Sequence, residues 1–370
     1  MTFLQKLTDK QKIILVARIA VLSFLAMIIY APKLWITTKD FPVIPLFDFI
    51  PIPRYPIDYI LAFVFVLLLI SFFIKPKKSI GITIVLLYFY LALVDQNRLQ
   101  PYFYQTILII LSVSYLRKSR KNTTIVLHCL MLIFIATYFF SGIQKINAHF
   151  NTIWMHAFSK HFYFLPETFR YLFTRSVPFI EALIGVFLLF NKTRRIAVVG
   201  ITIMHLGIVI LLLKFGYGYN VIPWNLQNIL SVIILFWYYQ SKYPFDIVTQ
   251  YFNYKKAVIL FLTFVLPTTN LFGYWDHLLS FSFFSAKLNY YYLEINDPKL
   301  LDQLPKEIQD FVFDYKDKKI INLNDWCGAV NGVLLYPEDR VTLKTQRFIE
   351  SFSDRKNTTK LVEYHHQKKD

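Results

Sequence analysis

The chain has 370 residues, of which 56% are hydrophobic, and its mean hydropathy is +0.44. A soluble globular protein of this size is usually less apolar. The net charge of +17 would suggest a nucleic-acid partner in a soluble protein, but here the basic residues form short clusters between apolar runs, as membrane topology requires. The composition therefore predicts an integral membrane protein and argues against a nucleic-acid-binding one.

The N-terminal segment MTFLQKLTDKQK is basic and precedes the first apolar run. No A-x-A cleavage site follows that run, so we expect a retained first helix and not a signal peptide.

Apolar runs of about 18 residues recur along the chain and predict about nine membrane-spanning helices. Residues 57–74 contain one charge, Asp58 at the edge of the run, and residues 196–213 contain none. The sixth run begins with Pro178, which suits the first turn of a helix. The expected spans are 13–30, 57–74, 79–96, 101–116, 123–143, 177–190, 196–213, 222–240 and 256–274.

The basic clusters between these spans predict their orientation, because cytoplasmic loops carry an excess of Lys and Arg. If the N-terminus is cytoplasmic, the dense clusters all fall on the cytoplasmic side and the residues after the ninth span lie outside. Abundant Ile, Lys, Phe and Tyr with few Gly suggest an AT-rich bacterial genome, so we expect the bacterial inner (plasma) membrane. The clusters are Lys75, Lys77 and Lys78; Arg117, Lys118, Arg120 and Lys121; Lys192, Arg194 and Arg195; and Lys242, Lys255 and Lys256.

The last residues change character and predict a separate small domain. The sequence DPKLLDQLPKEIQDFVFDY predicts one amphipathic helix with an Asp cap, and KKIINLND and GVLLYPEDRV predict short strands or turns. The polar residues from about 354 onward predict a disordered tail. The expected architecture is an all-α membrane domain of nine helices over residues 1–274 and a non-cytoplasmic α+β domain over residues 275–370.

Polar residues within the expected spans are costly in lipid, and each is therefore a candidate site residue. By their depth, those of six spans converge on the outer half of the bilayer. A carboxylate one turn deep, such as Glu181, needs a proton or a partner. The candidate catalytic residues are Lys145, Glu181 and His205, and the candidate substrate-binding residues are Gln100, Tyr102, Tyr104, Gln144, Asn225 and Asn228.

Each candidate also has a structural interpretation. Asp95 and Arg98 can form an i,i+3 pair at a helix end. Asn225 and Asn228 can bond neighbouring helices, and a lone His205 can be a hydrogen-bonded core residue. Lys145 can extend its amine to the lipid headgroups.

The sequence gives no support for a metal site. His149, His156 and His161 have spacings of seven and five residues, which match no common metal motif. Cys129 and Cys327 lie far apart, and neither has CxxC or zinc-type spacing, so a disulfide has no support either.

The segment YFFSGIQKIN at 138–147 resembles the Y-x-x-G-x-x-K-L segment of the vitamin K-dependent γ-carboxylase-like family, the HTTM superfamily. Residues 93–105 (LVDQNRLQPYFYQ), 204–226 and 272–285 resemble further segments of that family in the same order. The sixth expected span, with PFIEALIGVFLLF and the following TRR, resembles the related DoxX-type proteins. A nine-span layout also fits this resemblance.

The resemblance implies a quinone-linked carboxylase acting on an outer-side protein or peptide. In that family a hydroquinone reacts with oxygen to give a strong base, which removes a γ-proton from a glutamate side chain, and CO₂ then adds. A membrane lysine deprotonates the quinol, and the GIQKIN segment places that lysine at Lys145. Glu181 or His205 would accept or relay its proton, and Tyr102 stands where the animal members have a histidine.

Two other functional classes compete with this lyase or quinone-linked oxidoreductase. One is a non-catalytic membrane component that uses the outer domain to hold another protein. The other is a transporter, which is less favoured because the sequence shows no matched pair of broken helices.

Overall fold

The computed structural model describes residues 3–215, 218–243, 245–288, 290–355 and 357–364. The chain is mostly helical and forms two compact units, which are described separately. Unit 1 comprises residues 1–27, 65–88 and 101–287, and unit 2 comprises residues 28–64, 89–100 and 288–370. The compact units therefore do not follow the expected boundary at residue 274, because residues 28–64 and 89–100 group with the C-terminal residues.

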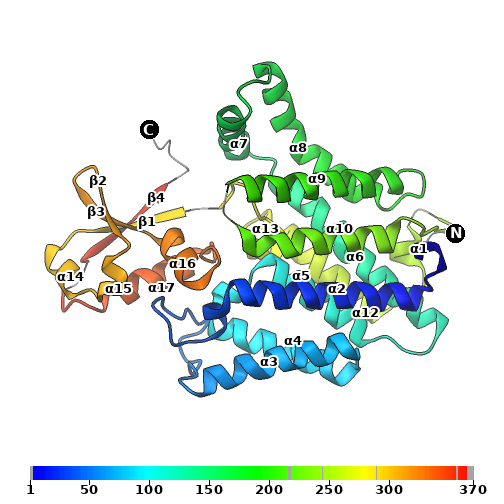
Figure 1. Ribbon diagram of the computed structural model, residues 1–370, viewed down its shortest axis with the longest axis horizontal. Coiled ribbons are helices and arrows are strands. Elements are labelled where there is room, and N and C mark those ends of the chain that lie inside the picture. Colours follow the sequence, from blue (N-terminus) through cyan, green and yellow to red (C-terminus); the bar gives the residue numbers. More distant parts are fainter. Residues whose placement is uncertain (1–2, 216–217, 244, 289, 356, 365–370) are drawn as a thin grey trace. The chain divides into compact units, whose positions relative to one another are not determined.

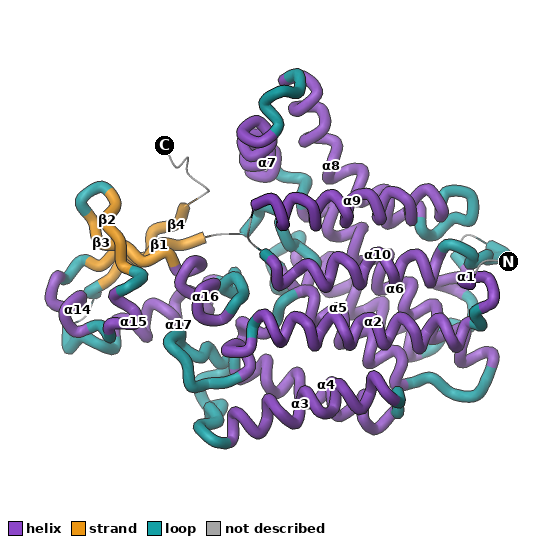
Figure 2. The backbone as a smooth tube through the Cα atoms, in the orientation of Figure 1, coloured by secondary structure: helices purple, strands orange, loops and turns teal. Residues whose placement is uncertain are grey.

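The apolar runs form helices, as the sequence predicts. The expected spans lie largely on helical residues, shown in purple in Figure 2, although several of them extend two to four residues beyond the end of the helix. The helices are α1 Phe3–Lys6, α2 Asp9–Tyr30, α3 Ile57–Ile74, α4 Lys78–Val94, α5 Pro101–Ser114, α6 Arg120–Gln144, α7 Ala148–His161, α8 Glu167–Phe187, α9 Arg194–Phe215, α10 Ile222–Phe236, α11 Asp246–Thr249, α12 Tyr254–Leu260 and α13 Leu266–Asn270. Short 3₁₀ segments occur at η1 Pro32–Trp35, η2 Gln96–Arg98, η3 Tyr219–Val221 and η5 Leu278–Ser280.

Among the described residues, five helical segments are long and apolar enough to cross a membrane: α2, α3, α6, α9 through Lys214, and Tyr219–Phe236. Helices α4 and α5 are apolar but shorter. The chain is thus a multi-pass membrane protein that lies in a lipid bilayer. Helix α8 begins about three turns before the expected span 177–190 and ends at Phe187, because Pro178 is accommodated inside the helix and does not start it.

Helix α6 is the central element of unit 1. Most of its membrane-length window is buried, and it contacts α5, α8, α10 and α12 (Figure 1). Its approach to α8 depends on two glycines. A Cβ at Gly142 would lie 2.6 Å from the Pro178 carbonyl oxygen, and a Cβ at Gly185 would lie 2.6 Å from the Phe139 nitrogen. Small residues at such crossings let two membrane helices pack backbone to backbone.

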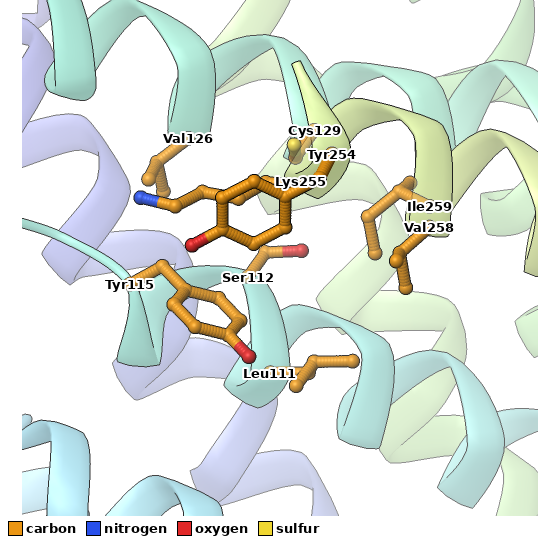
Figure 3. Close-up of a pocket in the computed structure, with 9 residues that line it drawn as sticks. All are labelled: Leu111, Ser112, Tyr115, Val126, Cys129, Tyr254, Lys255, Val258 and Ile259. Atoms are coloured by element: carbon orange, nitrogen blue, oxygen red, sulfur yellow. The ribbon is translucent and has the colours of Figure 1, made fainter.

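The last helical segment of unit 1 is not a regular α-helix. Helices α12 and α13 are joined by a π-helical turn, η4, at Phe261–Val265. In that turn the Leu262 carbonyl accepts a hydrogen bond from the Tyr104 hydroxyl of α5 at 3.3 Å. Residues of α5, α6 and α12 also enclose a cavity of about 60 Å³ (Figure 3).

Unit 2 contains the small α+β domain that the sequence predicts. Its antiparallel sheet has the order β2-β3-β1-β4, with Leu293 of β1 opposite Ile321 of β3 and Leu361 of β4. Leu293 and Ile321 are fully buried, and α16 packs on β1 and β3. The elements are β1 Tyr290–Ile295, α14 Pro298–Gln303, α15 Lys306–Gln309, β2 Val312–Tyr315, β3 Lys318–Asn322, α16 Leu323–Asn331, α17 Asp339–Glu350 and β4 Thr359–Tyr364.

Three local predictions for this domain differ from the structure. Residues 297–315 form two short helices and a strand, because Pro305 interrupts the expected single helix after Leu304. The Asp297 cap itself is present and accepts from the Lys299 amide at 3.0 Å. GVLLYPEDRV forms no strand and leads into α17, and residues 359–364 of the expected disordered tail form β4. The end of that tail, 365–370, lies outside the described residues.

Loop 31–56 packs within unit 2 against the C-terminal elements. The Trp326 ring of α16 is fully buried and lies 4.5 Å from the Phe41 ring, centroid to centroid. Its indole N–H donates to the Asp40 carbonyl at 3.0 Å. The prolines of this loop prevent a regular helix, so the loop is free to follow the surface of α16.

We predict that Gly142→Ala destabilises the protein by about 1–3 kcal/mol, because the new methyl group must separate α6 from the α8 backbone. The measurement is the thermal unfolding midpoint of the detergent-purified protein. Gly207→Ala is the matched control, since a Cβ at Gly207 of α9 meets no atom within 4 Å. The close packing of α6 on α8 would be disproved by equal midpoints for the two variants.

Candidate functional site

Lys145 and Glu181 form a buried ion pair between α6 and α8. Lys145 is the C-cap residue of α6, and its Nζ lies 2.6 Å from Glu181 Oε2. The same Nζ donates to Ser141 Oγ at 2.7 Å, one turn earlier on α6. The two charged side chains are only 10% and 9% exposed. Lys145 therefore points into the bundle, and its structural interpretation as a headgroup anchor is not the geometry observed.

The ion pair forms next to the point where Gly142 lets α6 and α8 come into close contact. Gly142 precedes Lys145 by three residues, and it packs against Pro178 and Ala182, which flank Glu181. The backbones are close at this level, so the lysine reaches the carboxylate with a short, direct contact. A charge-assisted hydrogen bond of this kind compensates both groups for the water they lose on burial. Either charge without the other would be strongly unfavourable in lipid.

His205 is held by hydrogen bonds at both ring nitrogens. Its Nδ1 lies 2.7 Å from Asn225 Oδ1, and its Nε2 lies 2.9 Å from the Tyr138 hydroxyl. The Asn225 amide nitrogen donates to the Val221 carbonyl at 2.8 Å, so the side-chain oxygen of Asn225 is the atom that accepts from His205. Nδ1 therefore carries the proton, and Nε2 accepts from Tyr138. In the neutral imidazole this arrangement leaves one tautomer.

The ion pair and the histidine chain belong to one cluster. Tyr138, Ser141 and Lys145 are spaced by three and four residues, which places them on one face of α6. The charge of Glu181 acts electrostatically on both Tyr138 and His205. We name six residues the acid–base cluster: Tyr138, Ser141, Lys145, Glu181, His205 and Asn225.

A second polar group of unit 1 is centred on Gln105 of α5. Its amide nitrogen donates to Thr137 Oγ1 at 3.0 Å and to Asn228 Oδ1 at 3.2 Å. Its oxygen accepts from the Trp224 indole at 2.7 Å and from Gln227 at 3.2 Å. The Gln105 amide thus joins α5, α6 and α10. Asn228 takes part in these bonds between helices, as its structural interpretation expects.

The remaining candidates occupy separate positions. Gln144 donates to Asn270 Oδ1 at 2.7 Å and accepts from Lys287 Nζ at 3.2 Å. The Tyr102 ring lies 6.0 Å from the Trp224 ring, and Tyr104 bonds η4. Gln100 belongs to unit 2, where its amide donates to the Asn97 and Leu334 carbonyls at 3.1 Å. Of the nine candidates, the structure brings Lys145, Glu181, His205 and Asn225 into the acid–base cluster.

Two members of this cluster are absent from the sequence-based candidates. Tyr138 lies in the aromatic run YFF, which is hard to distinguish from a lipid-facing stretch, and Ser141 is a common residue of membrane helices. The signal that identifies them is their spacing of seven and four residues before Lys145, which a helical projection places on the lysine face.

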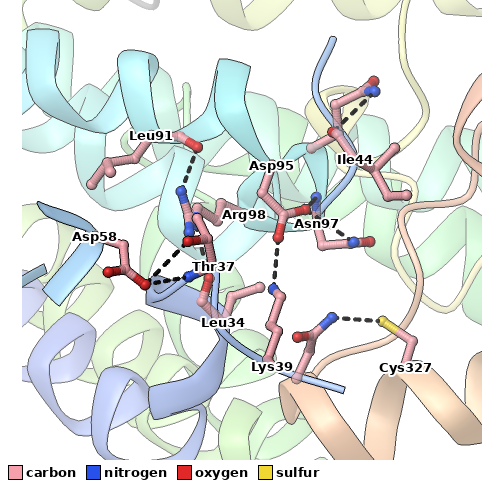
Figure 4. A network of polar contacts seen from close by, with 12 residues as sticks. Leu34, Thr37, Lys39, Ile44, Asp58, Leu91, Asp95, Asn97, Arg98 and Cys327 are labelled. Carbon is pink, nitrogen blue, oxygen red and sulfur yellow. Dashed lines mark hydrogen bonds and ion pairs between the residues drawn. The ribbon is translucent and has the colours of Figure 1, made fainter. Parts of the chain in front are cut away.

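Unit 2 contains its own buried ion pair, shown in Figure 4. Lys39 Nζ lies 2.7 Å from Asp95 Oδ2, and both side chains are fully buried. Arg98 donates to the Leu34 and Leu91 carbonyls at 2.8 and 2.7 Å. The expected i,i+3 pair of Asp95 with Arg98 misses Lys39, which lies 56 residues before Asp95 in the chain and reaches it only through the fold of loop 31–56. Burial lowers the pKa of Lys39, and the Asp95 charge opposes this.

The same network connects to the C-terminal domain. Asp95 Oδ1 accepts from both nitrogens of Asn97, and Asn97 Oδ1 accepts from the Tyr336 amide at 3.0 Å. Arg340 donates to Gln96 Oε1 at 2.6 Å. These contacts hold the segment 89–100 against the C-terminal domain, which indicates a structural role for the network.

The described residues contain no group of three or more His, Cys, Asp or Glu side chains that could hold a metal ion. Cys129 and Cys327 are buried free thiols. The side chains of the acid–base cluster are suited to proton exchange and hydrogen bonding.

Residues 123–223 match the family described as methylamine utilisation protein MauE. No curated protein matches the chain, and no solved structure matches it. The matched segment covers α6 to α9 and includes Tyr138, Ser141, Lys145, Glu181 and His205, whereas Asn225 lies just beyond it.

This match corrects the resemblance suggested by the sequence. The segments YFFSGIQKIN and PFIEALIGVFLLF both lie within residues 123–223, so the assignment to the vitamin K-dependent γ-carboxylase-like, or HTTM, family and in part to DoxX-type proteins is wrong. The residues that suggested it have local reasons of their own. Gly142 allows α6 to contact α8, and Lys145 pairs with Glu181.

We predict that Lys145→Met alone destabilises the protein by about 3–5 kcal/mol, because it leaves Glu181 as an uncompensated buried carboxylate. Lys145→Met combined with Glu181→Leu should recover most of that loss. The measurement is a double-mutant cycle of thermal unfolding in detergent, with the exposed Lys118→Met as the matched control. Additive losses in the double variant would show that the two side chains do not interact.

Proposed function

We propose that this chain is a non-catalytic membrane component that presents its α+β domain to a protein partner. The observation that carries the proposal is the exposed β2 edge of the sheet. Phe313 and Tyr315 of β2 are 41% and 40% exposed, and both rings contact Tyr292 of β1. An edge strand with exposed aromatic rings is a surface on which an extended protein segment can add a strand.

The geometry of the helices supports this role. The polar side chains within unit 1 are largely bonded to each other, as in the pairs Lys145–Glu181 and His205–Asn225. Such bonds fix the positions of the helices and leave fewer groups for a substrate. The family that residues 123–223 match is described by a process, methylamine utilisation, and by no chemical step. That description suits a component that supports an enzyme system.

Unit 2 also contains parts of three membrane helices. It groups the C-terminal domain with the last residues of α2 and α4 and the first residues of α3. We infer that nine spans place the N-terminus in the cytoplasm and this domain outside it. The inference rests on the agreement of the expected spans with helices and on the segregation of the basic clusters.

A single cysteine at position 313 tests both the side and the partner. We predict that Phe313→Cys reacts with a charged, membrane-impermeant maleimide in spheroplasts, whereas Lys192→Cys reacts only after permeabilisation. A benzophenone maleimide at position 313 should then give one discrete adduct on irradiation. Leu343→Cys on α17, 44% exposed, is the matched control in the same domain and should label without the adduct.

Two results would contradict the proposal. Protection of position 313 in intact spheroplasts would place the domain in the cytoplasm. Identical adduct patterns from positions 313 and 343 would show that the β2 edge has no specific partner.

A second candidate function rests on the acid–base cluster. The pair Lys145–Glu181 adjoins the chain Tyr138–His205–Asn225, which gives a series of groups that exchange protons within the membrane. Such a series suits a small lipophilic molecule that gains and loses protons, and a quinone in its hydroquinone form is the chemical class we propose. Lys145 is an ammonium in the observed pair, so it would first pass that proton to Glu181 or His205, and its neutral amine would then accept the hydroquinone proton as the base.

For this candidate, the detergent-purified protein should contain a quinone in stoichiometric amount, measured by extraction and chromatography. Lys145→Arg keeps the charge but cannot lose its proton at neutral pH, so it should retain the quinone and lose proton exchange with it. Absence of quinone from protein purified in mild detergent, or unchanged quinone redox titration in Lys145→Arg, would exclude this function.

A further inference from the structure

The cavity between α5, α6 and α12 lies at the end of unit 1 that carries the basic clusters. Its apolar walls come from Leu111 of α5, Val126 of α6, and Val258 and Ile259 of α12 (Figure 3). Its volume is about 60 Å³, enough for only a few carbon atoms. Val258, one of the lining residues, is 45% exposed, so part of the cavity wall also reaches the outer surface of α12.

Aromatic and cationic side chains form the rim of this cavity. The Lys255 amine lies 5.2 Å from the centre of the Tyr115 ring and 5.9 Å from that of Tyr254. The positive charges of Arg117 and Lys78 act on Lys255 electrostatically. None of the ion pairs found within the described part of the chain involves these three cations. Three like charges without a carboxylate repel one another, and a bound anion would relieve that repulsion.

We propose that this site binds an anionic phospholipid. The apolar cavity takes the first carbons of one acyl chain, and the phosphate lies among Lys78, Arg117 and Lys255. The two features together favour an anionic amphiphile. A free phosphate makes no contact with the apolar walls, and the positive group of a zwitterionic lipid is repelled by the basic rim. The hydroxyl-bearing rings of Tyr115 and Tyr254 suit the depth at which the glycerol backbone lies.

The site differs from the cations nearby that the fold already uses. Lys256, the next residue of α12, is fully buried and donates to His128 Nδ1 and to the carbonyls of α11. Arg194 donates to the Leu188 and Tyr239 carbonyls. The side chains of Lys78 and Arg117 are exposed, and that of Lys255 is half-buried beside the cavity. They are therefore positioned for a ligand that approaches from the bilayer.

The test is native mass spectrometry of the full-length, detergent-purified protein titrated with phosphatidylglycerol or phosphatidylcholine of equal chain length. We expect one tightly bound phosphatidylglycerol and weaker, non-stoichiometric phosphatidylcholine. Each of Lys255→Gln and Arg117→Gln should weaken phosphatidylglycerol binding roughly fivefold, the effect of about one surface charge. Val258→Phe, which fills the cavity and keeps the charges, should weaken it as well.

Lys192→Gln is the matched control, because it removes an exposed charge at the same end of unit 1 but away from the cavity. Its affinity for phosphatidylglycerol should equal that of the unchanged protein. Equal binding of the two lipids, or an equal loss in Lys192→Gln and Lys255→Gln, would overturn the proposal by showing only general charge attraction. Competition by inorganic phosphate, together with unchanged phosphatidylglycerol binding in Val258→Phe, would also overturn the proposal, because it would show a phosphate site that makes no use of the apolar cavity.

Discussion

An arginine or lysine side chain that is removed from water needs hydrogen-bond acceptors at fixed positions. In this protein many of those acceptors are the free carbonyl groups at helix ends. A helix leaves its last four carbonyl oxygens without partners inside the helix, and these carry partial negative charge. Buried arginine and lysine side chains use this supply repeatedly, and each such contact fixes where one helix ends against another. Arg98 donates to Leu91 of α4, Arg194 to the residues following α8, and Lys256 to the end of α11. The exposed Arg18 donates to the end of α3 in the same way.

Two of the buried lysines pair with a carboxylate, and each of these ion pairs joins segments that lie far apart in the chain. Lys39 reaches Asp95 in unit 2, and Lys145 reaches Glu181 in unit 1. Both pairs are almost completely shielded from water, so either partner alone would be a strongly unfavourable buried charge. The pairs therefore specify register: loop 31–56 has one position relative to segment 89–100, and α6 has one position along α8.

The helices could be predicted because the physical signal is local. An apolar run such as 57–74 contains the information for its own helix, and the structure begins and ends α3 at those residues. The single helix expected over 297–315 failed at Pro305, where a residue with no amide proton outweighs the amphipathic pattern. In the site, the expected depth in the membrane identified Lys145, Glu181 and His205 as candidates, but it did not identify their partners Tyr138 and Ser141. That His205 meets Tyr138 depends on how α6 and α9 pack, and no spacing within either helix encodes it.

Strand β4 has a consequence for the order in which the protein is made. Unit 2 is assembled from residues 28–64, 89–100 and 288–370, and β1 at the centre of its sheet pairs with β3 on one side and with β4 on the other. A ribosome releases loop 31–56 long before it reaches β4, so the loop waits through the synthesis of most membrane helices before its partners exist. The unit can therefore close only late in translation, and chains stalled before residue 359 display an unfinished sheet to proteases and chaperones.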